Sequence, residues 1–175
     1  MEARMNRALL VALIFYGPML ISGVWVRPPG ALHVVSWPRT AAGLLAAAAL
    51  SAATIAFSHW LVRHTVWGRR MKDEMRAALG VLASADILWL ALLSAFGEEF
   101  LFRGVLQPRL GPWWSTLLFG AFHFPFRPAM LPWTAFALAI GAILAGMTEL
   151  SLTLWPAILL HFCVNYFNLH DIAQA

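Results

Sequence analysis

Long apolar runs, separated by short polar or proline- and glycine-rich breaks, follow one another along the whole chain. A helix needs about 20 largely apolar residues to cross the hydrocarbon core of a bilayer, and most of these runs approach or exceed that length. They predict an all-α fold, a polytopic transmembrane helix bundle with about six membrane segments. The predicted segments are 8–26, 41–62, 77–107, 113–124, 131–149 and 152–169.

The breaks between the runs are turns rather than domain linkers. Pro108 and the Gly111-Pro112 pair end the third segment, because proline lacks an amide hydrogen and its ring clashes with the preceding turn. The fourth segment is short, so we expect neighbouring helices to shield part of it. The first run is too long for a secretory signal, and we expect it to be retained as a helix. Residues 1–175 are therefore expected to form a single membrane-embedded domain.

The composition supports a membrane protein and argues against nucleic acid as a partner. Hydrophobic residues make up 61% of the chain and charged residues 11%, whereas about a quarter of the residues in a soluble domain are charged. The net charge of +4 comes from basic residues that gather in one short predicted loop, 63–76, and at segment ends. That distribution is typical of the inner face of a membrane protein. The lone cysteine, Cys163, excludes an intramolecular disulfide.

The placement of lysine and arginine predicts the direction of the chain, because cytoplasmic loops carry an excess of these residues. If the amino terminus is inside, the outer side carries Arg27, Arg39 and Arg109. The inner side then carries the larger set of Arg4, Arg7, Arg63, Arg69, Arg70, Lys72, Arg76 and Arg127. We therefore expect a multi-pass protein of the cell inner (plasma) membrane with both termini in the cytoplasm.

A small set of polar residues interrupts the apolar segments. The set consists of Glu98, Glu99, Arg103, His123, His161 and Asn165. An ionisable side chain in a bilayer costs at least a few kcal/mol, so such residues are usually paired or functional. Carboxylates, histidines and a carboxamide are the side chains that a hydrolytic site needs, which favours an enzyme. The alternative is a polar network that only packs helices together.

The two glutamates are adjacent and therefore project about 100° apart on a helix. Glu99 and Arg103 are four residues apart and can pair along one face, which offsets part of the cost of burying both charges. Glu98 has no partner in its own helix. An unpaired carboxylate in an apolar site is suited to act as a general base.

The two histidines lie on different segments, and only His161 has a polar neighbour, Asn165, on its own helix face. A histidine beside a carboxamide can donate hydrogen bonds to a developing oxyanion; alternatively, these residues form hydrogen bonds between helices. Glu98, His123 and His161 could also bind zinc with water as the fourth ligand. The HExxH motif is absent and three segments would have to supply the ligands. We therefore expect no metal cofactor and keep zinc as the alternative.

Other polar residues give weaker signals. Asp86 stands alone in the third segment, where it could serve packing or gating. Ser94 and Ser115 lack the glycine-flanked turn and the neighbouring base of a serine hydrolase.

Three motifs, in order, resemble those of a known family. The stretch GEEFLFRGVLQ (97–107) resembles the EExxxR motif of the CAAX prenyl protease and bacteriocin-processing group, the CPBP or Abi family of intramembrane endopeptidases. FGAFH (119–123) matches its FxxxH motif, and HFCVN (161–165) matches its HxxxN motif. The resemblance covers about residues 77–170, the expected catalytic core, and leaves 1–76 as two amino-terminal helices.

The resemblance implies a glutamic-type intramembrane protease, a class formerly described as metalloproteases. By motif position, Glu98 and His123 would hold and activate water, while His161 and Asn165 would stabilise the oxyanion. The second glutamate and the arginine of the first motif would organise its helix.

The expected substrate is a membrane-associated protein or peptide, such as one with a carboxy-terminal sorting tail, and the expected surroundings are the lipid bilayer. The stretch MTELSLTLW before the third motif differs from the basic, threonine- and glycine-rich connection of the family, which leaves the substrate open. The non-enzymatic alternative is a bacteriocin-immunity or peptide-binding membrane protein that uses the same cavity. A transporter is not favoured, because the charged residues cluster on one helix and we find no paired repeat.

Overall fold

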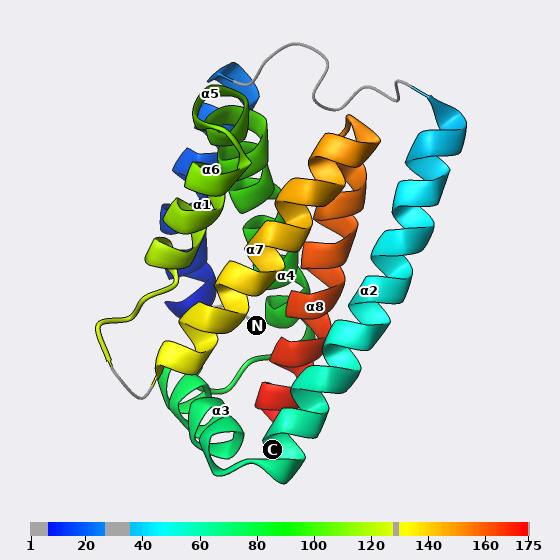
Figure 1. Ribbon diagram of the computed structural model, residues 1–175. Coiled ribbons are helices and arrows are strands. Elements are labelled where there is room, and N and C mark those ends of the chain that lie inside the picture. Colours follow the sequence, from blue (N-terminus) through cyan, green and yellow to red (C-terminus); the bar gives the residue numbers. More distant parts are fainter. Residues whose placement is uncertain (1–6, 27–35, 128–129, 175) are drawn as a thin grey trace.

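The computed structural model describes residues 7–26, 36–127 and 130–174, and every regular element within these ranges is a helix (Figure 1). The elements are α1 (Arg7–Val26), α2 (Trp37–His64), α3 (Val66–Leu79), α4 (Ser84–Glu98), the π-helix η1 (Glu99–Leu106), α5 (Gln107–Leu110), α6 (Pro112–Phe122), α7 (Leu131–Ser151) and α8 (Trp155–Gln174). The prediction of an all-α helix bundle is confirmed.

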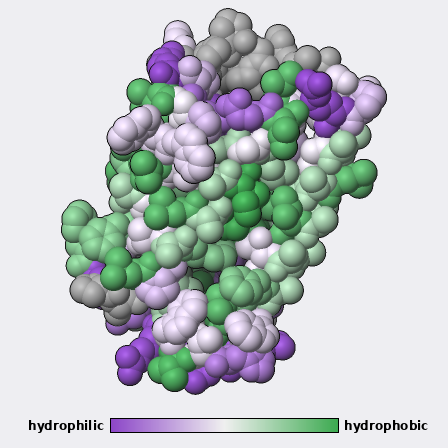
Figure 2. Space-filling model, viewed as in Figure 1, coloured by the Kyte–Doolittle hydropathy of each residue, from purple (hydrophilic) through white to green (hydrophobic). Residues whose placement is uncertain are grey.

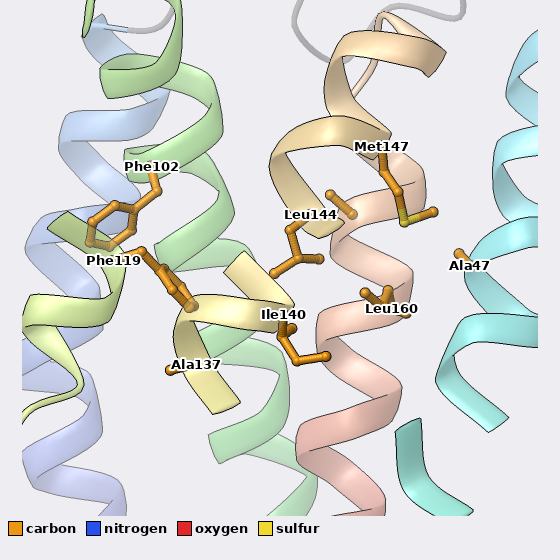
Figure 3. Close-up of a cluster of buried hydrophobic side chains, with 9 residues drawn as sticks. Ala47, Phe102, Phe119, Ala137, Ile140, Leu144, Met147 and Leu160 are labelled. Carbon is orange, nitrogen blue, oxygen red and sulfur yellow. The ribbon is translucent and has the colours of Figure 1, made fainter. Parts of the chain in front are cut away.

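The long helices run side by side around a shared apolar core. Helix α4 packs against α1 and α8, α8 also packs against α2, and α6 packs against α7. Phe102 and Phe119 meet edge to face with ring centroids 5.1 Å apart, and Leu144 and Leu160 belong to the same buried cluster (Figure 3). This cluster joins η1, α6, α7 and α8, and so fixes the positions of helices that carry or flank the predicted polar residues.

The outside of the bundle is apolar over its middle. Figure 2 shows hydrophobic residues across the middle of the viewed face and hydrophilic residues at both ends. Large hydrophobic side chains remain exposed on the outer helices, as with Ile14 on α1 and Leu45 on α2, which are 67% and 73% exposed. Soluble monomers rarely expose contiguous apolar surface on this scale, whereas lipid tails accommodate it.

Basic residues lie at the two ends in unequal numbers. The carboxyl end of α2 and all of α3 lie at one end of the bundle, and Arg39 and Arg109 belong to elements at the other (Figure 1). Arg127 belongs with the first end, because it forms an ion pair with Glu74 of α3. Arg4 and Arg27 lie outside the described residues. This separation agrees with the loops that the sequence predicts, and the side that faces the cytoplasm stays a prediction.

The predicted count of about six membrane segments is not confirmed. Among the described residues, α2 and α7 are long and apolar enough to cross a membrane, and α3 with Ser84–Leu110 would add a third if this pair, bent by 101°, counts as one span. Helix α1 contributes a shorter apolar stretch, Leu9–Trp25. Helix α6 has only 11 residues, and α8 carries polar side chains such as His161 and Asn165 along its length.

The prediction of a basic loop at 63–76 is wrong, because most of these residues lie in α3. Thr65 caps this helix, since its hydroxyl accepts a hydrogen bond from the Gly68 amide at 3.0 Å. Apolar residues then recur every four positions, at Trp67, Met71 and Met75, which gives the helix one apolar face. The helix ends at Gly80, whose φ of 70° suits glycine.

The predicted third segment is also not a single helix. Its first residues belong to α3, and α4 begins at Ser84 after the bend of 101°. Asp86 lies in the first turn of α4, where its carboxylate accepts a hydrogen bond from the Ala83 amide at 3.0 Å. Asp86 therefore caps a helix start, which corrects the expectation of a packing or gating residue in a helix interior.

The EExxxR motif continues into a π-helix, η1. The wider turn has i→i+5 hydrogen bonds, so the Gln107 amide donates to the Phe102 carbonyl. The Ser115 hydroxyl of α6 donates to the same carbonyl at 2.7 Å. Short π-helical turns occur often at functional sites, and this one begins immediately after Glu98.

Candidate active site

Glu98, at the end of α4, lies on the wall of a cavity of about 820 Å³. Its side chain is almost completely buried, and its Oε2 atom lies 3.6 Å from His123 Nε2 and 3.9 Å from His161 Nε2. The structure thus brings together one carboxylate and two histidines from α4, the end of α6 and α8. The sequence had placed them on three separate segments.

The ring of His123 is oriented by its own helix. Its Nδ1 atom lies 2.7 Å from the Phe119 carbonyl oxygen. Because a carbonyl can only accept, Nδ1 carries the hydrogen and Nε2 is turned toward Glu98. The rings of Phe119 and Trp133 flank the imidazole, with centroids 4.4 Å and 5.5 Å away. The spacing in the FxxxH motif therefore serves both a hydrogen bond and a ring contact.

His161 lies between the two adjacent glutamates. Its Nδ1 atom is 2.7 Å from Glu99 Oε1, and its Nε2 atom faces Glu98. The carboxylate of Glu99 accepts the Nδ1 hydrogen, which fixes the ring orientation. Sequence reasoning placed His161 beside Asn165 and missed this contact with Glu99, because it joins residues far apart in the chain.

Arg103 is fully enclosed and connects three helices. Its guanidinium contacts Glu99 Oε1 at 3.3 Å, donates to the Gly141 carbonyl of α7 at 2.9 Å, and lies 4.3 Å from the centroid of the Phe119 ring. A Cβ atom at Gly141 would lie 3.0 Å from the Phe119 ring and 3.4 Å from the guanidinium. The predicted pair of Glu99 and Arg103 is present, and it extends into a network that also includes His161.

Asn165 lies on the cavity wall with Glu98 and His123. Its amide nitrogen donates to the Ser94 hydroxyl at 2.9 Å, and that hydroxyl donates to the Ala91 carbonyl at 3.2 Å. Ser94 therefore orients Asn165, a role that its position in the sequence did not indicate. The predicted role of Asn165 in binding an oxyanion stays a prediction.

Tyr16 of α1 is a site residue that sequence reasoning missed. It lines the same cavity as Glu98, and its hydroxyl interacts with the Glu98 carboxylate. The available signal was a polar-tipped aromatic residue within an otherwise apolar run.

The cavity extends from Glu98 toward α3. The α3 residues Trp67, Met71 and Met75 line it, together with Lys72 and Asp171. Lys72 Nζ and the Asp171 carboxylate form an ion pair of 2.8 Å between α3 and α8. The cavity thus has an apolar wall along most of its length and charged residues at its α3 end.

The sequence that forms this site matches a known protein family. A family described as type II CAAX prenyl endopeptidase Rce1-like matches residues 80–167. The chain belongs to this Rce1-like family. The resemblance inferred from the three motifs is thereby confirmed, and the matched range contains all six predicted site residues but leaves out Tyr16.

One relative of this Rce1-like protein is an uncharacterised protein of Bacillus subtilis, YpbD. The two are 40% identical over 81 residues, which is 45% of this chain and 41% of the relative. The chain thus matches about two fifths of that relative's length. No solved structure matches the chain.

The Rce1-like site contains three possible metal ligands, Glu98, His123 and His161. Within the ranges that the structure describes, no group of three or more His, Cys, Asp or Glu side chains has the arrangement of a metal site. The expectation that the reaction needs no metal stays a prediction, with zinc as its alternative.

Proposed function

We propose that this protein is an intramembrane endopeptidase that hydrolyses a peptide bond with water activated by Glu98 and His123. The observation that carries the proposal is the distance of 3.6 Å between Glu98 Oε2 and His123 Nε2 in a largely apolar cavity. One water oxygen can lie within about 2.8 Å of both atoms, which is hydrogen-bonding distance. Membership of the Rce1-like family supports the same class of reaction.

The hydrogen positions favour a water molecule held for attack. His123 Nε2 accepts a hydrogen bond, because Nδ1 already carries the ring hydrogen. Glu98 accepts the second hydrogen of the same water. Both hydrogens are then engaged, and a lone pair of the water oxygen is free to attack the substrate carbonyl.

The proposed reaction proceeds in two proton transfers. Glu98 takes a proton from water as the new bond between oxygen and the carbonyl carbon forms. The bond between carbon and nitrogen then breaks, and the protonated Glu98 returns the proton to the leaving amine. The apolar surroundings strengthen each of these interactions, because little solvent screens them.

Asn165 is proposed to bind the oxyanion. A carboxamide nitrogen carries two hydrogens, and Ser94 accepts only one of them. The second can be donated to the negatively charged oxygen of the intermediate. His161 can contribute from Nε2 when it is protonated, since its Nδ1 hydrogen is already given to Glu99.

The proposed substrate is a membrane-associated peptide or protein with an extended apolar segment, such as a carboxy-terminal sorting tail. An apolar segment fits the wall formed by residues such as Phe57, Leu61 and Leu90. The charged residues at the α3 end, Lys72 and Asp171, would lie toward the polar part of such a substrate. A substrate would not need to be prenylated to fit this cavity.

Comparison of membrane proteomes tests the proposal. Cells would produce the parent, Glu98→Gln or the control Glu74→Gln, and newly formed protein termini would be identified by mass spectrometry. Glu74 is a suitable control because it forms a partly exposed ion pair with Arg127. We expect termini that appear with the parent and the control but not with Glu98→Gln. Termini that persist in Glu98→Gln cells would contradict the proposal.

A non-enzymatic peptide-binding role is the second candidate, and the large apolar cavity favours it. Binding alone does not need an activated water. A cellular immunity or sorting phenotype that survives Glu98→Ala and His123→Ala together would support binding and exclude hydrolysis as its cause.

A further inference from the structure

Helix α1 lies outside the residues that match the Rce1-like family, yet it supplies Tyr16 to the cavity wall. The position of α1 is defined closely by α4. A Cβ atom added to Gly97 would lie 3.2 Å from both the Cβ atom and the carbonyl oxygen of Tyr16. The backbones of the two helices therefore meet at the residue immediately before Glu98.

A second glycine keeps α1 close about two turns beyond Tyr16. A Cβ atom at Gly23 would lie 2.4 Å from the Cβ atom of Phe100, a distance that real Cβ atoms do not tolerate. Close contacts at Gly97 and Gly23 fix both the height and the rotation of α1 against α4 and η1. Packing of α1 against α4 therefore helps to determine where the Tyr16 side chain lies.

The Glu98 carboxylate faces two histidines on one side and Tyr16 of α1 on the other. Oε2 faces the two histidines, and it has no hydrogen-bond partner among the described residues. The Tyr16 hydroxyl interacts with the same carboxylate from the α1 side of the cavity. The carboxylate thus has a neighbour on α1, while its Oε2 atom is available to water.

We propose that Tyr16 is a positioning residue for Glu98 in hydrolysis, an inference that rests on the proposed role of Glu98 as the base. Its hydroxyl, beside the carboxylate on the cavity wall, keeps that carboxylate oriented with Oε2 toward His123 Nε2. A base that is oriented before the substrate arrives loses less rotational freedom in the transition state. The amino-terminal helix would thus take part in the reaction and not only in membrane insertion.

The chain offers a matched control, because it contains only two tyrosines, Tyr16 and Tyr166. Both pack against the same buried cluster of α1, α4 and neighbouring residues, but Tyr166 does not line the cavity. Replacement of either by phenylalanine removes one hydroxyl and keeps the ring. We expect Tyr16→Phe to lower kcat about tenfold through lost orientation of Glu98, with KM unchanged and at most a small fall in Tm. Tyr166→Phe should leave all three quantities unchanged.

The kinetic assay uses purified protein in liposomes with internally quenched peptides that carry an apolar carboxy-terminal segment. If the parent cleaves and the Tyr16→Phe protein has the kcat of the Tyr166→Phe protein, the inference is wrong while the proposed function stands. A parent that cleaves none of the peptides or membrane proteins tested counts against the proposed function instead.

Fluorine NMR detects the contact between Tyr16 and Glu98 independently of catalytic activity. Protein labelled with meta-fluorotyrosine should give one fluorine resonance for each of its two tyrosines, and Tyr166→Phe assigns them. We expect Glu98→Gln to move the Tyr16 resonance and to leave that of Tyr166 in place. A Tyr16 resonance that does not respond to Glu98→Gln would overturn the inference, whatever the activity.

Discussion

Glu98 and Glu99 are adjacent and chemically identical, but the structure gives them different contacts. Glu98 lies on the cavity wall with one oxygen free. Glu99 is completely buried and contacts both Arg103 and His161. The first is available to a substrate, and the second is available only to the protein.

Removal of Arg103 should therefore destabilise the protein. Arg103→Ala leaves the buried carboxylate of Glu99 without its cation, and such changes typically cost about 3–5 kcal/mol. Glu98→Gln leaves no unpaired charge and should abolish activity with little change in stability. Thermal unfolding in detergent compares the two. If Arg103→Ala unfolds at the parental Tm and Glu98→Gln collapses, the roles of the two glutamates are reversed.

Ser94 provides a second test at the residue scale. Ser94→Ala frees the Asn165 amide from its hydrogen bond and should lower kcat severalfold through loss of orientation. Ser58→Ala is the matched control, because Ser58 forms a hydrogen bond of 2.7 Å with Asn168, another cavity residue of α8. Initial rates of peptide cleavage measure both variants. Equal rates for the two would argue that Asn165 does not bind the oxyanion.

The sequence identified some site residues because they are polar within apolar segments. Glu98, His123 and His161 stand out in this way, and the structure brings them together. Tyr16 and Ser94 are compatible with a lipid-facing or packed helix, so neither gives a signal of its own. Their roles come from contacts between distant helices, which no local pattern encodes.

At the scale of elements, the same limit explains the errors in helix boundaries. The regular apolar spacing of 77–107 is compatible with one α-helix, but Gly80 and the cap at Asp86 end one helix and begin another. The π-helical turn of η1 depends on packing, as in the contact between Ser115 and the Phe102 carbonyl. The many charged residues of α3 led to its prediction as a loop. Its apolar residues are recognisable as one helix face only because they line the cavity.

Close packing of α1 against α4 gives a prediction for this pair of helices. Gly97→Ala would bring a methyl group within 3.2 Å of Tyr16, and overpacking of this kind typically costs about 1–3 kcal/mol. We expect a lower Tm and a lower kcat. Gly17→Ala is the control, because a Cβ atom there meets nothing within 4 Å. Equal Tm values for the two variants would show that α1 can move away from α4 without cost.

At the scale of the whole molecule, apolar composition correctly predicted a membrane protein but not its number of spans. Hydropathy identifies apolar segments in the sequence. To cross a membrane, a helix must also be long enough and must face lipid. Helix α6 is short, with 11 residues, and it packs against α7. In α8, His161 is buried within the bundle and Asn165 lines the cavity. Because these side chains do not face lipid, the helix can carry polar residues.

We expect that the reaction as a whole requires no metal ion. Treatment with a strong chelator should leave the rate of peptide cleavage unchanged, and metal analysis of the purified protein should show far less than one zinc per chain. Zinc that is stoichiometric, and that is lost and restored together with activity, would instead support a metalloprotease in which Glu98, His123 and His161 are ligands.

The central claim is that Glu98 activates water for peptide hydrolysis, and its most direct test is the cleavage rate of purified Glu98→Gln protein. The parent, Glu98→Gln and Glu74→Gln would be reconstituted in liposomes with the same quenched peptide. Glutamine keeps the shape of the side chain but cannot take a proton from water. We expect only Glu98→Gln to lose cleavage while its Tm stays parental; cleavage by folded Glu98→Gln protein at the parental rate would show that Glu98 does not activate the water.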